Sequence, residues 1–97
     1  MERPKYKPNN LALYRRRIGF TQKQVAELLG HANATMISHY ESNRALPPLG
    51  VALSLEILYR TPVAFLFPGL HDDLKRSLRE HEESLRASAG QKPLPLT

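Results

Sequence analysis

The stretch TQKQVAELLGHANATMISHYE, residues 21–41, has the pattern of two short helices that meet at a glycine. Thr21 is a typical N-cap residue, and Gln24 stands three residues after it, as a capping box requires. We therefore expect a helix over residues 22–29. Gly30 can adopt the left-handed conformation that commonly ends a helix.

The second helix of this stretch is predicted over residues 33–42. Asn33 is a good N-cap residue, and Ile37 and Tyr40 form an apolar pair three residues apart. Asn43 tolerates the left-handed conformation and can end the helix. A pair of short helices linked through a glycine turn is the pattern of a helix-turn-helix motif.

Outward from this pair, apolar spacing and helix-ending residues predict four further helices. Asn10 is the expected cap of the first of these helices. The helix that begins at Leu49 is almost wholly apolar, so we expect it to be buried. No segment alternates with period two for long enough to form a strand, and the fold class is therefore all-α. The four helices are expected at residues 11–18, 49–59, 62–67 and 69–89.

Proline content, charge and apolar spacing divide the chain into four segments. We expect a flexible basic arm, then a helical domain, then an amphipathic C-terminal helix with several opposite-charge pairs four residues apart, and finally a disordered tail. These segments comprise residues 1–9, 10–68, 69–89 and 90–97.

The composition of the 97 residues favours a soluble cytoplasmic protein. The chain has no cysteine, which excludes a disulfide framework and a thiolate metal site. No apolar run approaches the roughly 18 residues of a membrane span. The first ten residues are basic and lack the apolar core of a signal peptide.

The net charge of +5 is concentrated in one half of the chain. Residues 1–44 contain eight Lys or Arg against three Glu, whereas residues 45–97 contain six of each sign. A basic face favours a polyanionic partner such as nucleic acid, although a merely soluble basic surface has the same composition.

The central half of the chain resembles the Cro/phage-repressor (XRE-type) helix-turn-helix family over roughly residues 10–68. The strings GFTQKQVAELLG, MISHYE and LP carry the resemblance. It implies a five-helix repressor-like domain, to which the C-terminal helix is an addition, and a protein that binds double-stranded DNA. The matching residues are Arg15, Gln22, Ala26, Gly30, Ile37, Glu41 and Pro47.

The sequence departs from the family pattern at the turn between the two helices. The family places a buried aliphatic residue six positions after the glycine, but Ile37 stands seven positions after Gly30. Either the turn at residues 31–33 carries one extra residue, or Met36 takes the buried place. We prefer the extra residue, because the second register puts His39 where the family has an apolar residue.

With this register, the resemblance implies two sets of DNA contacts. In a helix-turn-helix, the second helix presents its N-terminal residues to base edges in the major groove, and flanking residues bind phosphates. Asn33 has capping as an alternative role, and His39 is alternatively a solvated surface residue. The residues implied at base edges are Asn33, Ala34, Thr35, Ser38 and His39. Those implied at phosphates are Arg16, Arg17, Gln22, Ser42, Asn43 and Arg44.

The resemblance also implies a structural role for Arg15 and Glu41. In this family the corresponding positions form a largely buried ion pair that ties the first helix to the third. Such a pair sets geometry more than it adds stability, and removing one partner leaves a charge buried without compensation.

A homodimer is the expected assembly, because helix-turn-helix proteins commonly bind two half-sites about one DNA turn apart. The C-terminal helix can pair with its symmetry mate, and it can equally fold back on its own domain. The dimerisation candidates are Phe65, Phe67, Leu74, Leu78 and Leu85.

The sequence contains no pattern typical of an enzyme, a cofactor site or a metal site. His71 and His81 each precede two acidic residues, but ten helical residues rotate the chain by about 280° net, so the two histidines do not share a face. We therefore expect a non-enzymatic repressor. The rival hypothesis is an antitoxin-like or partner-dependent interaction module whose C-terminal helix binds another protein.

Overall fold

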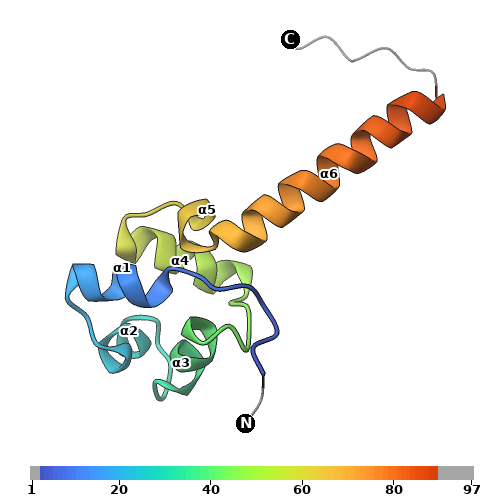
Figure 1. Cartoon of the computed structure of the whole chain (residues 1–97). Coiled ribbons are helices and arrows are strands. Elements are labelled where there is room, and N and C mark those ends of the chain that lie inside the picture. The colour runs from blue at the N-terminus through green and yellow to red at the C-terminus, as the bar shows by residue number, and fades with distance from the viewer. Residues whose placement is uncertain (1–2, 90–97) are drawn as a thin grey trace.

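The structure, a computed structural model, describes residues 3–89, and these residues fold into six helices (Figure 1). No strand occurs among these residues, and the predicted all-α fold is confirmed. The tail predicted at residues 90–97 lies outside the described part. The helices are α1 (Leu11–Ile18), α2 (Gln22–Leu28), α3 (Thr35–Glu41), α4 (Leu49–Tyr59), α5 (Val63–Leu66) and α6 (Pro68–Ala89).

The core lies where the first five helices meet. Apolar side chains from each of these helices are almost completely removed from water, which is the main favourable term in folding. Leu70, in the first turn of α6, packs against this core, whereas the rest of α6 projects away from it (Figure 1). The buried cluster comprises Leu11, Val25, Ala26, Ile37, Tyr40, Leu55, Tyr59, Leu66 and Phe67.

The first four helices all end with the same backbone motif. In each, the residue after the last turn has a positive φ angle, and the next backbone N–H reaches back five residues to a helix carbonyl. This is the Schellman arrangement, which satisfies carbonyl groups that the helix leaves unpaired. The residues with positive φ are Gly19, Gly30, Asn43 and Arg60.

The start of α1 differs from the prediction. Asn10 makes no side-chain cap hydrogen bond; its amide donates instead to the carbonyl of Phe65. The backbone N–H of Leu11 donates to Asn9 Oδ1 at 3.0 Å. Two asparagines precede α1, and it is the side chain of Asn9, reaching forward to the N–H two residues later, that satisfies the helix terminus.

The segment predicted to be a flexible basic arm makes hydrogen bonds to the rest of the domain at residues 5–9. The backbone N–H groups of Lys5 and Tyr6 both donate to the carbonyl of Asn43. Lys7 Nζ donates to Asp73 at 2.8 Å and holds the pKa of that carboxyl below its ordinary value. These bonds join segments that lie far apart in the sequence, and they fix the arm between α3 and α6.

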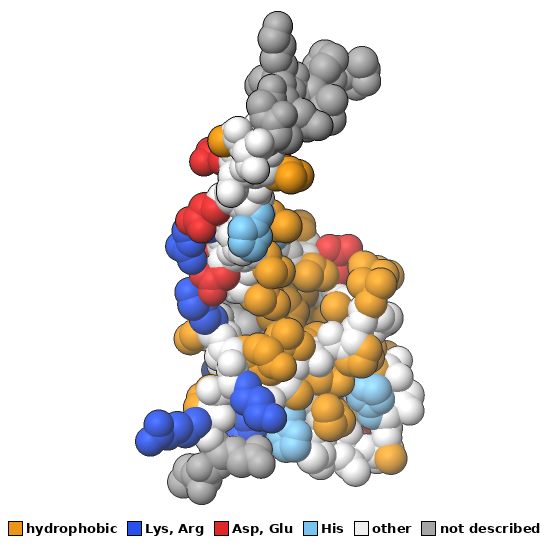
Figure 2. Space-filling view, turned by 90° about the vertical axis from the view of Figure 1, so that its right-hand side faces the viewer, with side chains coloured by type: hydrophobic (Ala, Val, Ile, Leu, Met, Phe, Trp, Pro, Cys, Tyr) orange, Lys and Arg blue, Asp and Glu red, His pale blue; other side chains and the backbone are white. Residues whose placement is uncertain are grey.

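Helix α4 was expected to be buried, but only one of its faces is. Ala52, Leu55 and Tyr59 face the core, but Leu49 and Ile57 are about three-quarters exposed. Figure 2 shows that apolar side chains on this side of the molecule form a band that continues from the globular part onto α6.

Candidate nucleic-acid interface

The turn between α2 and α3 contains one extra residue, as in the register that we preferred. Gly30, at φ +77°, follows α2, and His31 N–H closes the helix end by donating to the carbonyl of Ala26 at 2.8 Å. Ile37 is 2% exposed and Met36 is 40% exposed. Ile37 therefore fills the buried position, and α3 is oriented by Ile37 rather than Met36.

The first turn of α3 presents polar groups to the outside. Asn33 and Thr35 are both exposed, and Asn33 Oδ1 accepts a hydrogen bond from the Thr35 backbone N–H at 2.9 Å. Asn33 thus caps α3 from two residues outside it, and α3 is shorter than the predicted range of 33–42. The Asn33 amide group and the Thr35 hydroxyl and methyl groups face away from the core.

The other three residues implied at base edges are less exposed. Ala34 packs against the core, which makes it part of the support of α3. Ser38 and His39 are half-buried along the same helix. The carbonyl of His39 accepts bonds from Ser42 Oγ and from the backbone N–H of Arg44, so the residues after α3 are tied back to the helix.

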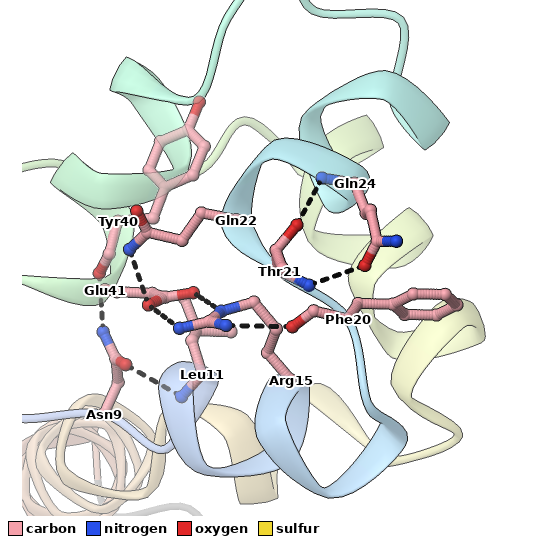
Figure 3. A network of polar contacts seen from close by, with 9 residues as sticks. All are labelled: Asn9, Leu11, Arg15, Phe20, Thr21, Gln22, Gln24, Tyr40 and Glu41. Atoms are coloured by element: carbon pink, nitrogen blue, oxygen red, sulfur yellow. Dashed lines mark hydrogen bonds and ion pairs between the residues drawn. The ribbon is translucent and has the colours of Figure 1, made fainter.

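A hydrogen-bonded ion pair fixes how α1, α2 and α3 lie against one another (Figure 3). Arg15 Nε donates to Glu41 Oε2 at 2.6 Å, and Arg15 Nη2 donates to Oε1 at 3.1 Å. Arg15 Nη1 also donates to the carbonyl of Phe20 at 2.9 Å. Both charged side chains are at most 10% exposed. The bonds to Glu41 outweigh burial and raise the pKa of Arg15.

Gln22 joins this network. Its Nε2 donates to Glu41 Oε1 at 3.0 Å, so the Gln22 side chain bonds a carboxylate within the protein instead of extending freely toward a phosphate (Figure 3). As the first residue of α2, Gln22 also has a backbone N–H without a partner inside the helix. The capping box between Thr21 and Gln24 secures this helix start with bonds in both directions.

The remaining phosphate candidates lie at two places. Arg16 and Arg17 are exposed on α1, where the Arg17 guanidinium lies 5.4 Å from the Tyr14 ring centre. Arg44 is half-buried after the end of α3, beside Ser42.

Asn9 is a residue of the interface region that the sequence analysis missed. Its Nδ2 donates to the carbonyl of Tyr40 and to Asn43 Oδ1, both at 2.8 Å. The side chain of Asn43 is therefore occupied in holding the arm to the end of α3. The two adjacent asparagines before α1 were a signal for such a residue, but the spacing alone did not show which of them turns inward.

The dimerisation candidates divide into exposed and buried residues. Phe65 is 60% exposed, but Phe67 is 6% exposed and belongs to the core, so Phe67 is withdrawn as a candidate. Phe67 closes α5 with its ring turned inward, where burial removes its apolar surface from water. Leu74, Leu78 and Leu85 are 53%, 66% and 66% exposed along α6.

Within residues 3–89, no group of three or more His, Asp or Glu side chains has the arrangement of a metal site. None of the helices in this range is long and apolar enough to cross a membrane.

A comparison with protein-family models places the chain in a family. The family model described as Helix-turn-helix matches residues 11–66, which spans α1 to α5 and more than half of the chain. No curated protein and no solved structure matches the chain.

Proposed function

Because this chain belongs to the helix-turn-helix family of DNA-binding regulators, in its Cro/phage-repressor (XRE-type) branch, we propose that it represses transcription by binding an operator as a dimer. Residues 10–68 act as the DNA-binding unit, and α6 joins two copies. In this proposal the bound dimer represses by steric exclusion at the operator.

The observation that carries this proposal is the first turn of α3. Its exposed polar groups stand on a helix that Ile37 and Tyr40 anchor in the core. Helix α3 enters the major groove, where the Thr35 hydroxyl bonds a base edge or its methyl contacts a thymine methyl. The free amide of Asn33 reads the adjacent base, and His39 and Ser38 extend the contact along the groove.

Phosphate contacts on both sides of α3 position it. The backbone N–H of Gln22 binds one phosphate, because the start of a helix attracts anions. Arg44 and Ser42 bind another phosphate after α3, and Arg16 and Arg17 add basic charge on α1. These contacts give affinity without reading sequence, so they explain the concentration of positive charge in residues 1–44.

The test is selection of duplexes from a random DNA pool, followed by binding measurements on variants. We expect an inverted repeat, and a loss of about 1 to 3 kcal/mol of binding free energy for Thr35→Ala on that site. The loss for non-specific DNA should be small. Ser84→Ala, an exposed change on α6, serves as the control. Failure to select any motif at moderate salt overturns the proposal.

A protein-interaction module is the second candidate function, and the exposed leucines of α6 favour it. In that case the helix-turn-helix serves as a scaffold. The changes Thr35→Ala and His39→Ala distinguish the two candidate functions. A DNA-binding regulator loses specific DNA binding, whereas an interaction module keeps the affinity for its protein partner.

A further inference from the structure

Helix α6 carries a seam of residues spaced alternately three and four positions apart. This spacing is the pattern of a helix that packs along a second helix. The three leucines of the seam are each more than half exposed. The charged residues of α6 lie to the sides or on the back. The seam comprises His71, Leu74, Leu78, His81, Leu85 and Ser88.

The seam runs into an apolar groove of about 250 Å³ at the base of α6. The groove lies between α4, α5 and the first turns of α6, and its walls include Leu49, Val63, Phe67 and Leu74. His71 is the one polar side chain among its lining residues. The groove and the seam therefore form one uncovered apolar surface (Figure 2). An apolar surface of this extent, rimmed by charges, is typical of an interaction site.

We propose that α6 of a second copy of this chain covers this surface and runs antiparallel to the first α6. This inference rests on the proposed function in one respect, that the protein is a dimer. Leu74 of each copy packs opposite Leu85 of the other, and Leu78 packs opposite His81. The C-terminal turn of each α6, with the small residues Ala87 and Ser88, then reaches the groove of the other copy.

Charge decides the direction of the two helices. Lys75 follows Leu74 and Glu82 follows His81, so both lie on the same flank of the seam. When identical helices run antiparallel, equivalent flanks come together, because the two-fold axis is perpendicular to the plane of the helices. Lys75 of each copy then faces Glu82 of the other, within about two residues, or about 3 Å, along the axis.

A parallel pair lacks this complementarity. There the flank with Lys75 and Glu82 meets the opposite flank, which consists of Leu70, Ser77 and Ser84 and has no charge. A parallel pair would also place each seam histidine opposite the same histidine of the other copy. Charges beside the seam commonly set helix direction in such pairs. The bond that Glu82 makes to Arg86 is an exposed pair within one helix, which contributes little and leaves Glu82 available.

The antiparallel pair holds the globular parts of the two copies at opposite ends of the paired helices. Its two-fold axis lies between residues 79 and 80, about twelve residues from the start of α6. The two helix starts are then about 34 Å apart along the axis, at about 1.5 Å per residue.

The first experiment is disulfide trapping, for which the natural chain is suited because it has no cysteine. In an antiparallel dimer, Leu74→Cys and Leu85→Cys proteins form few disulfides alone and form a mixed disulfide when combined under oxidised glutathione. Arg79→Cys, on the outer face, is the control and should not crosslink. Crosslinking of each single variant with itself shows a parallel pair and overturns the inference.

The second experiment reverses the flank charges and measures the dimer dissociation constant by sedimentation. Lys75→Glu and Glu82→Lys should each raise this constant about tenfold, since attraction becomes repulsion at both contacts. The double variant should restore it to within a few-fold of the natural protein. Arg79→Glu is the control. Equal dissociation constants for all variants, or a monomeric natural protein, overturn the inference.

The outcomes separate this inference from the proposed function. A protein that is an antiparallel dimer without DNA but selects no motif supports the inference and contradicts the proposed function. A monomer that selects a single half-site contradicts the inference and retains DNA recognition.

Discussion

Glu41 joins three helices and so helps to set the orientation of α3. It accepts hydrogen bonds from Arg15 on α1 and from Gln22 on α2, while it belongs to the last turn of α3 itself. A buried ion pair contributes little net stability but allows few alternative arrangements, because each charge needs its partner. The network therefore specifies the angle between the helices.

We predict that Glu41→Ala lowers the free energy of unfolding by about 3 to 5 kcal/mol, because it leaves the Arg15 guanidinium buried without a partner. The double change Arg15→Met with Glu41→Leu removes both charges and should cost much less. Urea unfolding of the three proteins at neutral pH measures both values. A cost below about 1 kcal/mol for Glu41→Ala would show that water reaches Arg15 in solution.

The pKa of Tyr59 predicts how the free energy of unfolding changes at alkaline pH. Burial, with a further contribution from the nearby Glu41 charge, raises the pKa of Tyr59 to about 12. In the unfolded chain a tyrosine has a pKa of about 10. Between these values the unfolded chain loses the proton and the folded protein keeps it. The stability contribution is therefore complete below about pH 10 and is lost as the pH rises toward 12.

Tyr59→Phe tests this at the same residue. Its effect on unfolding free energy at pH 7 should be small, and between pH 9 and 11 it should lose about 1 kcal/mol less than the natural protein. Urea unfolding at the two pH values measures the difference. Equal losses in both proteins would mean that Tyr59 titrates normally in the folded state.

At the scale of helices, the ends are specified by local sequence more strictly than the interiors. Each of α1 to α4 stops where one residue adopts a left-handed conformation. Glycine or asparagine takes this conformation at three of the four ends, so these helix ends could be predicted from the sequence. Arg60 ends α4 in the same way although its side chain disfavours that conformation.

Two glycine substitutions with opposite effects test this. Gly30→Ala places a side chain at φ +77° and should lower the free energy of unfolding by about 1 kcal/mol. Gly50→Ala lies inside α4 with no atom within 4 Å of the new Cβ, and should raise it by up to about 1 kcal/mol. Thermal unfolding distinguishes them. If both changes act in the same direction, the turn does not hold Gly30 in its left-handed conformation.

At the scale of the whole molecule, the proposed dimer would contain each proposed phosphate contact twice, and the salt dependence of binding reports this number. We predict that Arg44→Ala reduces the slope of log affinity against log salt by about 2 for a dimer on its operator, since each phosphate contact contributes about 0.9. Binding titrations between 50 and 200 mM salt measure the slope. Arg79→Ala, on the outer face of α6, should leave it unchanged, and a reduction near 1 for Arg44→Ala would indicate one bound copy.

Much of the fold was predictable from the sequence alone. The positions of all six helices, the capping box of α2 and the ends at Gly19 and Gly30 depend on interactions within a few residues, so a single sequence contains them. The family resemblance, and the DNA-reading role that it implies for α3, rest on the same short strings.

Contacts between distant residues were decided only by the tertiary structure. The turn register became clear from the burial of Ile37, and the same packing turned Phe67 inward. The arm is held by Asn9, whose partners lie more than thirty residues away. Several residues of a sequence can often form the same hydrogen bond or ion pair with a given side chain. The packing of the helices decides which of them come into contact. Local sequence therefore determined which helices form, and packing determined which side chains the protein buries, pairs or leaves exposed.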